Sequence, residues 1–128
     1  MRPFFLSLSF VLVLLILSCG SSQHATNGEG YTRTTNGSTV SVLEDEYRIH
    51  IPTAFPGGVV TFHIVNDGKM KHSFKIKGNT TEQQLPNDIA PGDSADLTVN
   101  LTPGVYDIDC PVFGHAQLGM RLSVTVTQ

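Results

Sequence analysis

The chain is poor in the residues that several protein classes require. It has only two cysteines and no tryptophan in 128 residues, too few cysteines for a fold built on several disulfides. Basic residues are also few: eight Lys and Arg stand against eleven Asp and Glu, and the formal net charge is −3. Nucleic-acid binding needs clustered Lys and Arg, so this composition argues against it. Convincing amphipathic helices are missing as well, which leaves strands as the expected elements.

The longest apolar run lies at the N-terminus, from Phe4 to Leu17, behind Arg2. It is shorter than the roughly 20 residues that a membrane-spanning helix needs, and its flanks are typical of a secretory signal peptide over residues 1–18. The run ends in "ILSCG", which resembles the lipobox of bacterial lipoproteins with Cys19 as the lipidated residue. The alternative is an ordinary signal peptide cleaved a few residues later. Lipidation predicts an exported protein anchored to the cell membrane and facing the periplasm or the cell exterior.

The rest of the chain divides into a tether and one domain. Residues 19–38 are rich in Gly, Ser, Thr and Asn and are predicted to be a flexible tether. Residues 39–128 show short apolar-alternating segments separated by Gly, Pro and Asn turns, as in "VVTFHIVN" and "RLSVTVT". This pattern predicts an all-β domain, an antiparallel β-sandwich of about 90 residues.

One segment near the C-terminus collects metal-binding residue types. "CPVFGHAQLGM" contains Cys110, His115 and Met120, and its proline and glycines suit a curled loop between the last two strands. Taken singly, each of the three side chains is more typical of a core or a surface position than of a metal site. With Cys19 used for lipid, Cys110 is an unpaired thiol in an exported protein, where burial or metal binding would protect it from oxidation.

A second imidazole must come from elsewhere in the chain. His50 and His63 lie within alternating strands and are expected to face solvent, as is His24 in the tether. His72 begins a strand after the turn "NDGKMK", so it is the preferred candidate and His50 the second. Two imidazoles, a thiolate and a thioether form the ligand set of a mononuclear blue copper centre, with one ion cycling between Cu(I) and Cu(II). Zinc gains little from a thioether, and a binuclear copper centre would need a second loop cysteine.

The segments "VNDGKMKHSFKIKG" and "TPGVYDIDCPVFGHAQLGMRLSVTV" resemble the cupredoxin family over residues 39–128. The spacing from Cys110 to His115 to Met120 is similar to that of the rusticyanin, auracyanin and sulfocyanin branch. The resemblance implies a Greek-key β-sandwich with His72, Cys110, His115 and Met120 as copper ligands. It also implies a hydrogen bond from the Ser73 backbone to the Cys110 sulfur, and a route for electrons through His115.

The expected function is electron transfer, because four protein ligands leave no open position for a substrate. The partners would be redox proteins such as cytochromes or a terminal oxidase, and the domain would be monomeric. Phe113 and Leu118 suit an apolar docking patch or the core equally well. The lysines of "KMKHSFKIK" suit a solvated strand edge or a patch for an acidic partner. Three rival functions stay open: a copper carrier in copper handling, a copper enzyme, which would need a second domain, and a structural domain without metal.

Overall fold

Strands make up the regular structure of the chain. The computed structural model describes residues 26–27, 30–34 and 37–128. The strands in chain order are β1 (Thr26–Asn27), β2 (Tyr31–Thr34), β3 (Gly37–Asp45), β4 (Arg48–His50), β5 (Ala54–Pro56), β6 (Gly58–Asn66), β7 (Lys75–Gly78), β8 (Thr81–Gln84), β9 (Ser94–Leu101), β10 (Gly104–Asp109) and β11 (Arg121–Thr127). None of the described residues forms a helix of the length and hydrophobicity that a membrane span requires.

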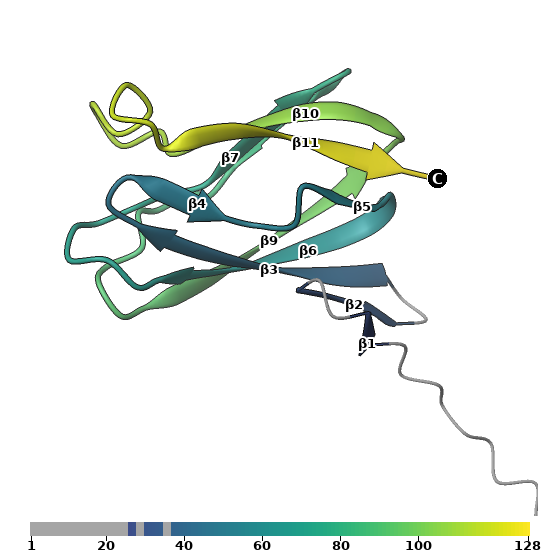
Figure 1. Cartoon of the computed structure of the whole chain (residues 1–128), viewed down its shortest axis with the longest axis horizontal. Helices are drawn as coiled ribbons and strands as arrows, with labels where there is room; N and C mark the ends of the chain where they lie inside the picture. The colour runs from purple at the N-terminus through teal and green to yellow at the C-terminus, as the bar shows by residue number, and fades with distance from the viewer. Residues whose placement is uncertain (1–25, 28–29, 35–36) are drawn as a thin grey trace, which may run out of the picture.

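The strands form two sheets packed face to face (Figure 1). One sheet has the order β1-β2-β3-β6-β9, with β4 paired to β3, and the other has the order β5-β11-β10-β7-β8. The predicted all-β sandwich is confirmed.

Most strand pairs are antiparallel, but two pairs in the described part of the chain are parallel. β3 runs parallel to β6, and β5 runs parallel to β11. The reason lies in the path of the chain: β5 belongs to the second sheet, so the chain leaves the first sheet after β4 and returns to it as β6. A connection of that length allows parallel pairing, which a tight hairpin does not.

Strand pairing begins earlier than residue 39. β3 starts at Gly37, β2 pairs with it antiparallel, and β1 pairs with β2. Part of the segment 19–38 that is predicted to be a tether therefore lies in strands. The tyrosine and threonines of β2 favour strand conformation, and the edge of β3 offers unpaired backbone groups to receive them.

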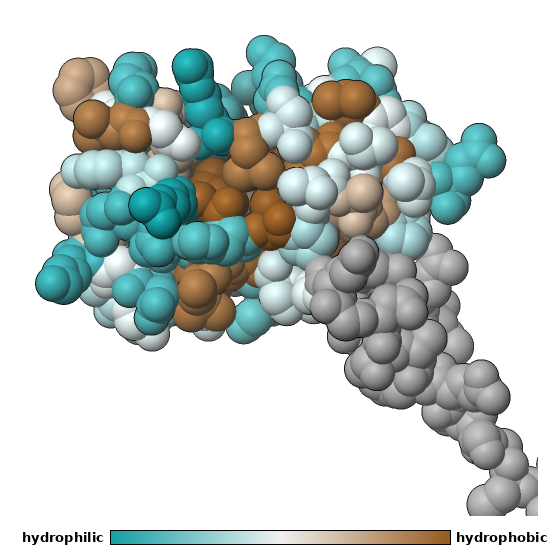
Figure 2. Space-filling model, viewed as in Figure 1, coloured by the Kyte–Doolittle hydropathy of each residue, from teal (hydrophilic) through white to brown (hydrophobic). Residues whose placement is uncertain are grey.

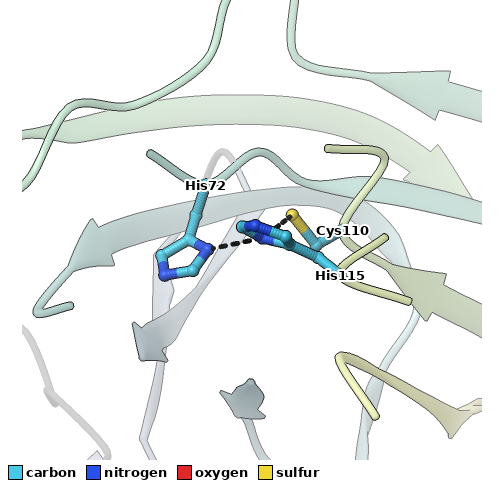
Figure 3. Close-up of side chains that lie close together, drawn as sticks. All are labelled: His72, Cys110 and His115. Carbon is cyan, nitrogen blue, oxygen red and sulfur yellow. Dashed lines mark hydrogen bonds between the residues drawn. The ribbon is translucent and has the colours of Figure 1, made fainter. Parts of the chain in front are cut away.

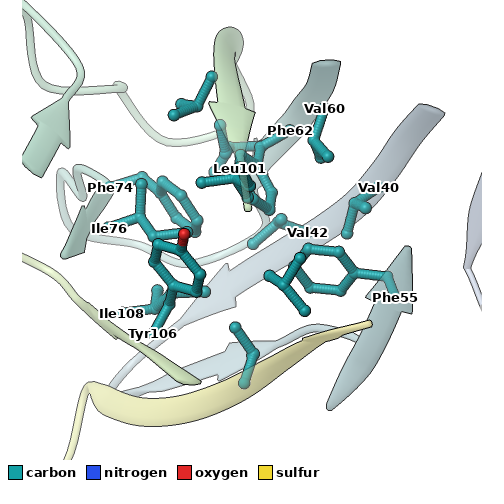
Figure 4. Close-up of a cluster of buried hydrophobic side chains, with 14 of the residues drawn as sticks. Val40, Val42, Phe55, Val60, Phe62, Phe74, Ile76, Leu101, Tyr106 and Ile108 are labelled. Atoms are coloured by element: carbon teal, nitrogen blue, oxygen red, sulfur yellow. The ribbon is translucent and has the colours of Figure 1, made fainter. Parts of the chain in front are cut away.

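The core lies between the two sheets and follows the alternation seen in the sequence. On β6 the buried residues are Val60, Phe62 and Ile64, as predicted, and on β11 they include Val124 and Val126. Aromatic rings meet in the centre, with Phe62 5.7 Å from Phe55 and 5.1 Å from Phe74 between ring centroids (Figure 4). Because both sheets contribute, the core fixes how their strand ends meet at each end of the sandwich.

Candidate metal centre

Two segments far apart in the sequence supply the candidate ligands at one end of the sandwich. His72 lies just before β7, and it exchanges backbone hydrogen bonds with Ile89 of the loop before β9. Cys110 directly follows β10, whose residue Asp109 pairs with Lys75 of β7. The pairing of β7 with β10 thus brings the two segments together, although His72 and Cys110 are 38 positions apart.

The segment from Cys110 to Met120 is the curled loop that its composition predicts. The Cys110 N–H donates to the Met120 carbonyl over 3.0 Å, and the Met120 N–H donates to the His115 carbonyl over 3.1 Å. Gly114 and Gly119 have φ values of +85° and +112°, which residues with a Cβ rarely adopt. These bonds close the loop and bring its first, middle and last residues to one place.

Three donor atoms converge in this loop and beside it (Figure 3). The Nδ1 atoms of His72 and His115 are 3.2 Å apart, and the Cys110 Sγ lies 3.6 Å from the His115 Nδ1. Nitrogen and sulfur atoms that share one first-row metal ion, at about 2.0 and 2.3 Å from it, lie roughly 3.2–3.7 Å apart. All three donor atoms lie within 4.8 Å of one another, so the set can hold a single ion.

Met120 completes the predicted set of residues at the site. Its side chain is fully buried, and its backbone is bonded to both Cys110 and His115, as described above. Together with the two imidazoles and the thiol, its thioether makes up the donor types of a blue copper centre.

The ligand side chains are buried from solvent, and this burial shifts the pKa values of Cys110 and His115. His72, Cys110 and Met120 are fully buried, and His115 is only 3% exposed. Burial raises the pKa of the Cys110 thiol, while the N–H of Ser73, which donates to Sγ over 3.4 Å, acts in the opposite direction. Burial also lowers the pKa of His115, which keeps its imidazole neutral and available as a ligand. The thiol must lose its proton when a metal binds, so binding is expected to release a proton.

The turn between β3 and β4 contacts both histidines, a feature that the sequence analysis missed. Glu46 Oε1 lies 3.3 Å from the Nε2 of His72, and the Tyr47 ring packs edge-on against His115 with centroids 5.1 Å apart. The acidic interruption in "VLEDEYRI" was the signal available, but nothing in its pattern ties it to a histidine 26 positions away.

The other histidines lie away from the site. His50 is exposed and paired with Asp45 at 3.0 Å, and His63 is exposed and paired with Asp96 at 2.6 Å. Both therefore face outward, as expected. His24 and Cys19 lie outside the described residues.

Within the described part of the chain, three of the four lysines near His72 are paired with carboxylates, and the exception is Lys69. Lys71, Lys75 and Lys77 each lie within 4.0 Å of a carboxylate of this chain, on Asp88, Asp109 and Glu82 respectively. These pairs favour the solvated strand edge over a docking surface for an acidic partner.

The loop side chains whose position the sequence left open are on the surface. Phe113 is fully exposed and Leu118 is 61% exposed, so neither packs in the core. His115, by contrast, reaches the surface with only a small fraction of its side chain.

Solved structures with the same fold include an auracyanin, rusticyanin and a chain of a heme-copper terminal oxidase. A reduced auracyanin from Roseiflexus castenholzii is 20% identical, with a TM-score of 0.61, over 70% of this chain and 97% of the other. Reduced rusticyanin is 24% identical, with a TM-score of 0.56, over 74% and 82% of the two chains. A chain of a heme-copper terminal oxidase dimer is 19% identical, with a TM-score of 0.54, over 70% of this chain and 63% of that one.

At such identities these likenesses establish the fold. No curated protein sequence matches the chain. A family model described as the sulfocyanin (SoxE) domain matches residues 61–128, which is more than half of the chain and includes all four predicted ligands. The chain therefore belongs to the sulfocyanin (SoxE) family, and it is a cupredoxin whose site takes one copper ion.

Proposed function

We propose that this chain carries single electrons between redox proteins at the outer face of a bacterial membrane, with His72, Cys110, His115 and Met120 as its copper ligands. The observation that carries this proposal is the convergence of three buried donors, His72, Cys110 and His115, in one place. The buried Met120 is tied to this place by its backbone hydrogen bonds to Cys110 and His115. A copper ion bound there supplies one-electron chemistry between Cu(I) and Cu(II). The closed donor set leaves no position at which a substrate could bind, which favours electron transfer over catalysis.

The fold contributes by fixing the positions of the ligand side chains. The loop bonds between Cys110, His115 and Met120, and the packing of Tyr47 on His115, fix the positions of the ligands. A site that is held in one geometry needs little rearrangement when the charge of the ion changes, so transfer can be fast.

The partner is expected to dock over the loop 110–120. Figure 2 shows some apolar side chains among polar ones at the end of the molecule where this loop lies in Figure 1. The exposed apolar residues of that end include Phe113 and Leu118, and Met70, which is 44% exposed and contacts the Tyr47 hydroxyl through its sulfur. An apolar patch beside His115 suits brief contact with a redox partner, for which we propose a cytochrome or a terminal oxidase.

Visible absorption of the copper-loaded protein tests the electron-transfer proposal. We expect an intense thiolate-to-Cu(II) band that a reductant bleaches. Cys110→Ser should abolish the band. His63→Gln, which replaces an exposed histidine outside the site, should leave it unchanged. A folded wild-type protein that stays colourless after copper titration would rule the proposal out.

A copper carrier is the competing function, because it would use the same ligands. The two differ in how readily Cu(I) leaves: a carrier releases it to a soluble chelator within the time of an assay, whereas a redox centre retains it. Full burial of the ligands supports retention.

Anchoring through Cys19 is tested separately. If this residue carries lipid, the wild-type protein expressed in a bacterium fractionates with membranes, and Cys19→Ala appears in the soluble exported fraction.

A further inference from the structure

The carboxylate of Glu46 is held in one place by the backbone of another loop. Its Oε1 accepts the N–H of Lys69 over 2.8 Å and the N–H of Met70 over 2.7 Å. These two residues lie in the loop between β6 and β7, just before His72. The carboxylate therefore links the β3–β4 turn to the segment that carries a copper ligand.

The same oxygen faces the outer nitrogen of His72. Nε2 lies 3.3 Å from Oε1, on the opposite side of the ring from the Nδ1 that faces His115. His72 is fully buried, and its Nε2 has no aligned hydrogen-bond partner among the described residues. The contact with Oε1 therefore counts as an ion-pair contact and not as a hydrogen bond.

Close packing leaves no room for another group at this contact. A Cβ added to Gly68 would lie 2.6 Å from Glu46 Oε1 and 2.8 Å from His72 Nε2. Real Cβ atoms do not approach other atoms so closely. The absence of a side chain at residue 68 is therefore what allows the carboxylate and the imidazole to meet.

Two backbone N–H groups, those of Lys69 and Met70, both donate to Glu46 Oε1, and such donors favour the charged carboxylate. An anion beside Nε2 favours the tautomer with the proton on Nε2, and this leaves the Nδ1 lone pair free for a metal. It also makes the imidazole a stronger donor, which stabilises Cu(II) more than Cu(I).

We propose that Glu46 is a positioning residue for the copper site: its carboxylate keeps the proton of His72 on Nε2, directs Nδ1 to copper and lowers the reduction potential. The parts of this inference that concern copper, the direction of Nδ1 and the reduction potential, rest on the proposed copper function. The placement of the proton concerns the copper-free protein as well. There, His72 Nδ1 is an acceptor, so the proton between the two rings belongs to His115 Nδ1.

The first experiment measures the reduction potential of copper-loaded Glu46→Gln. Glutamine keeps the size of the side chain and a carbonyl oxygen for the Lys69 and Met70 N–H groups, but it removes the charge. We expect the preference of the site for Cu(II) over Cu(I) to fall about tenfold, which raises the potential by about 59 mV. Glu82→Gln is the matched control, because Glu82 is an exposed residue of β8 paired with Lys77, and its potential should equal that of the wild type.

The second experiment reads the tautomer of His72 by ¹⁵N NMR at pH 8 in the copper-free wild type and in Glu46→Gln. We expect the wild type to carry the proton on Nε2 and the variant to show a mixture of tautomers. A protonated Nδ1 with a bare Nε2 in the wild type would overturn the proposal even if the variant failed to fold. If Glu46→Gln and Glu82→Gln have equal reduction potentials, the proposal is overturned too. The role of Glu46 is then only to connect the β3–β4 turn to the β6–β7 loop by hydrogen bonds. A colourless wild type would count against the copper function, while the NMR result would still decide where the proton lies.

Discussion

The backbone N–H of Ser73 donates a hydrogen bond to the Cys110 sulfur over 3.4 Å. Ser73 directly follows the predicted ligand His72, and its N–H contacts a second predicted ligand, Cys110. A donor at this sulfur draws electron density away from it and weakens its bond to Cu(II) more than its bond to Cu(I). The hydrogen bond is therefore expected to raise the reduction potential.

Removing this donor should lower the potential. Ser73→Pro deletes the N–H, and a fall of about 59 mV would correspond to a tenfold gain in preference for Cu(II). Ser73→Ala is the control, because it keeps the N–H and removes only the hydroxyl, so its potential should stay close to that of the wild type. Equal potentials in the two variants would mean that the N–H does not tune the copper. Voltammetry of the copper-loaded proteins provides the measurement.

The buried carboxyl group of Glu44 should make the free energy of unfolding depend on pH. Its side chain is fully buried on β3, and neither carboxyl oxygen has a hydrogen-bond partner among the described residues. Burial raises the pKa of Glu44 from 4.5 to about 8. Between these values the folded protein keeps a proton on Glu44 that the unfolded chain has lost. The contribution of Glu44 to the free energy of unfolding should therefore fall as pH rises, by about 1.4 kcal/mol per pH unit.

Denaturant unfolding of the copper-free protein between pH 5 and 8 tests this slope. Glu44→Gln cannot titrate, so its unfolding free energy should vary less with pH than that of the wild type. Glu82→Gln, an exposed substitution, should keep the wild-type slope. Parallel profiles for the wild type and Glu44→Gln would show that Glu44 ionises normally in the folded state.

The sequence predicted those parts of the molecule that depend on short-range pattern. Alternation placed Val60, Phe62 and Ile64 in the core, and glycine and proline indicated a curled loop between the last two strands. Spacing within that loop was enough to name three candidate ligands. His72 followed from its place at a strand end, and the hydrogen bond from Ser73 followed from the family resemblance.

The sequence could not predict contacts that depend on how distant turns meet. Glu46 and Tyr47 follow an acidic stretch whose pattern is that of a solvated turn, yet the packing of the two sheets brings them against His72 and His115. The parallel pairing of β3 with β6 was missed for the same reason, because it requires knowing that β5 belongs to the other sheet. The exposure of Phe113 was undecided, since a loop residue next to the core can face either way.

Gly68→Ala should disturb the copper site through steric contact alone. The new methyl group would overlap Glu46 Oε1 and His72 Nε2, and one of these side chains must move. We expect weaker copper binding, a shifted visible band and a loss of about 1–3 kcal/mol in the free energy of unfolding. Asp67→Ala, an exposed substitution one position earlier, should change none of the three. A wild-type spectrum for Gly68→Ala would mean that the turn adjusts without moving the imidazole.

Phe113→Ala should slow electron transfer without altering the copper site. The ring of Phe113 is fully exposed, so its removal creates no cavity, and the visible band and the unfolding free energy should remain those of the wild type. A well-placed apolar side chain in a docking interface contributes about 1–2 kcal/mol, so the bimolecular rate constant should fall about tenfold. Stopped-flow oxidation of reduced cytochrome c by the copper-loaded protein gives this rate. The matched control is Val105→Ala, because Val105 is 63% exposed and lies at the end of β10 opposite Cys110. If both substitutions slow the reaction equally, or neither does, the partner docks elsewhere than on the loop 110–120.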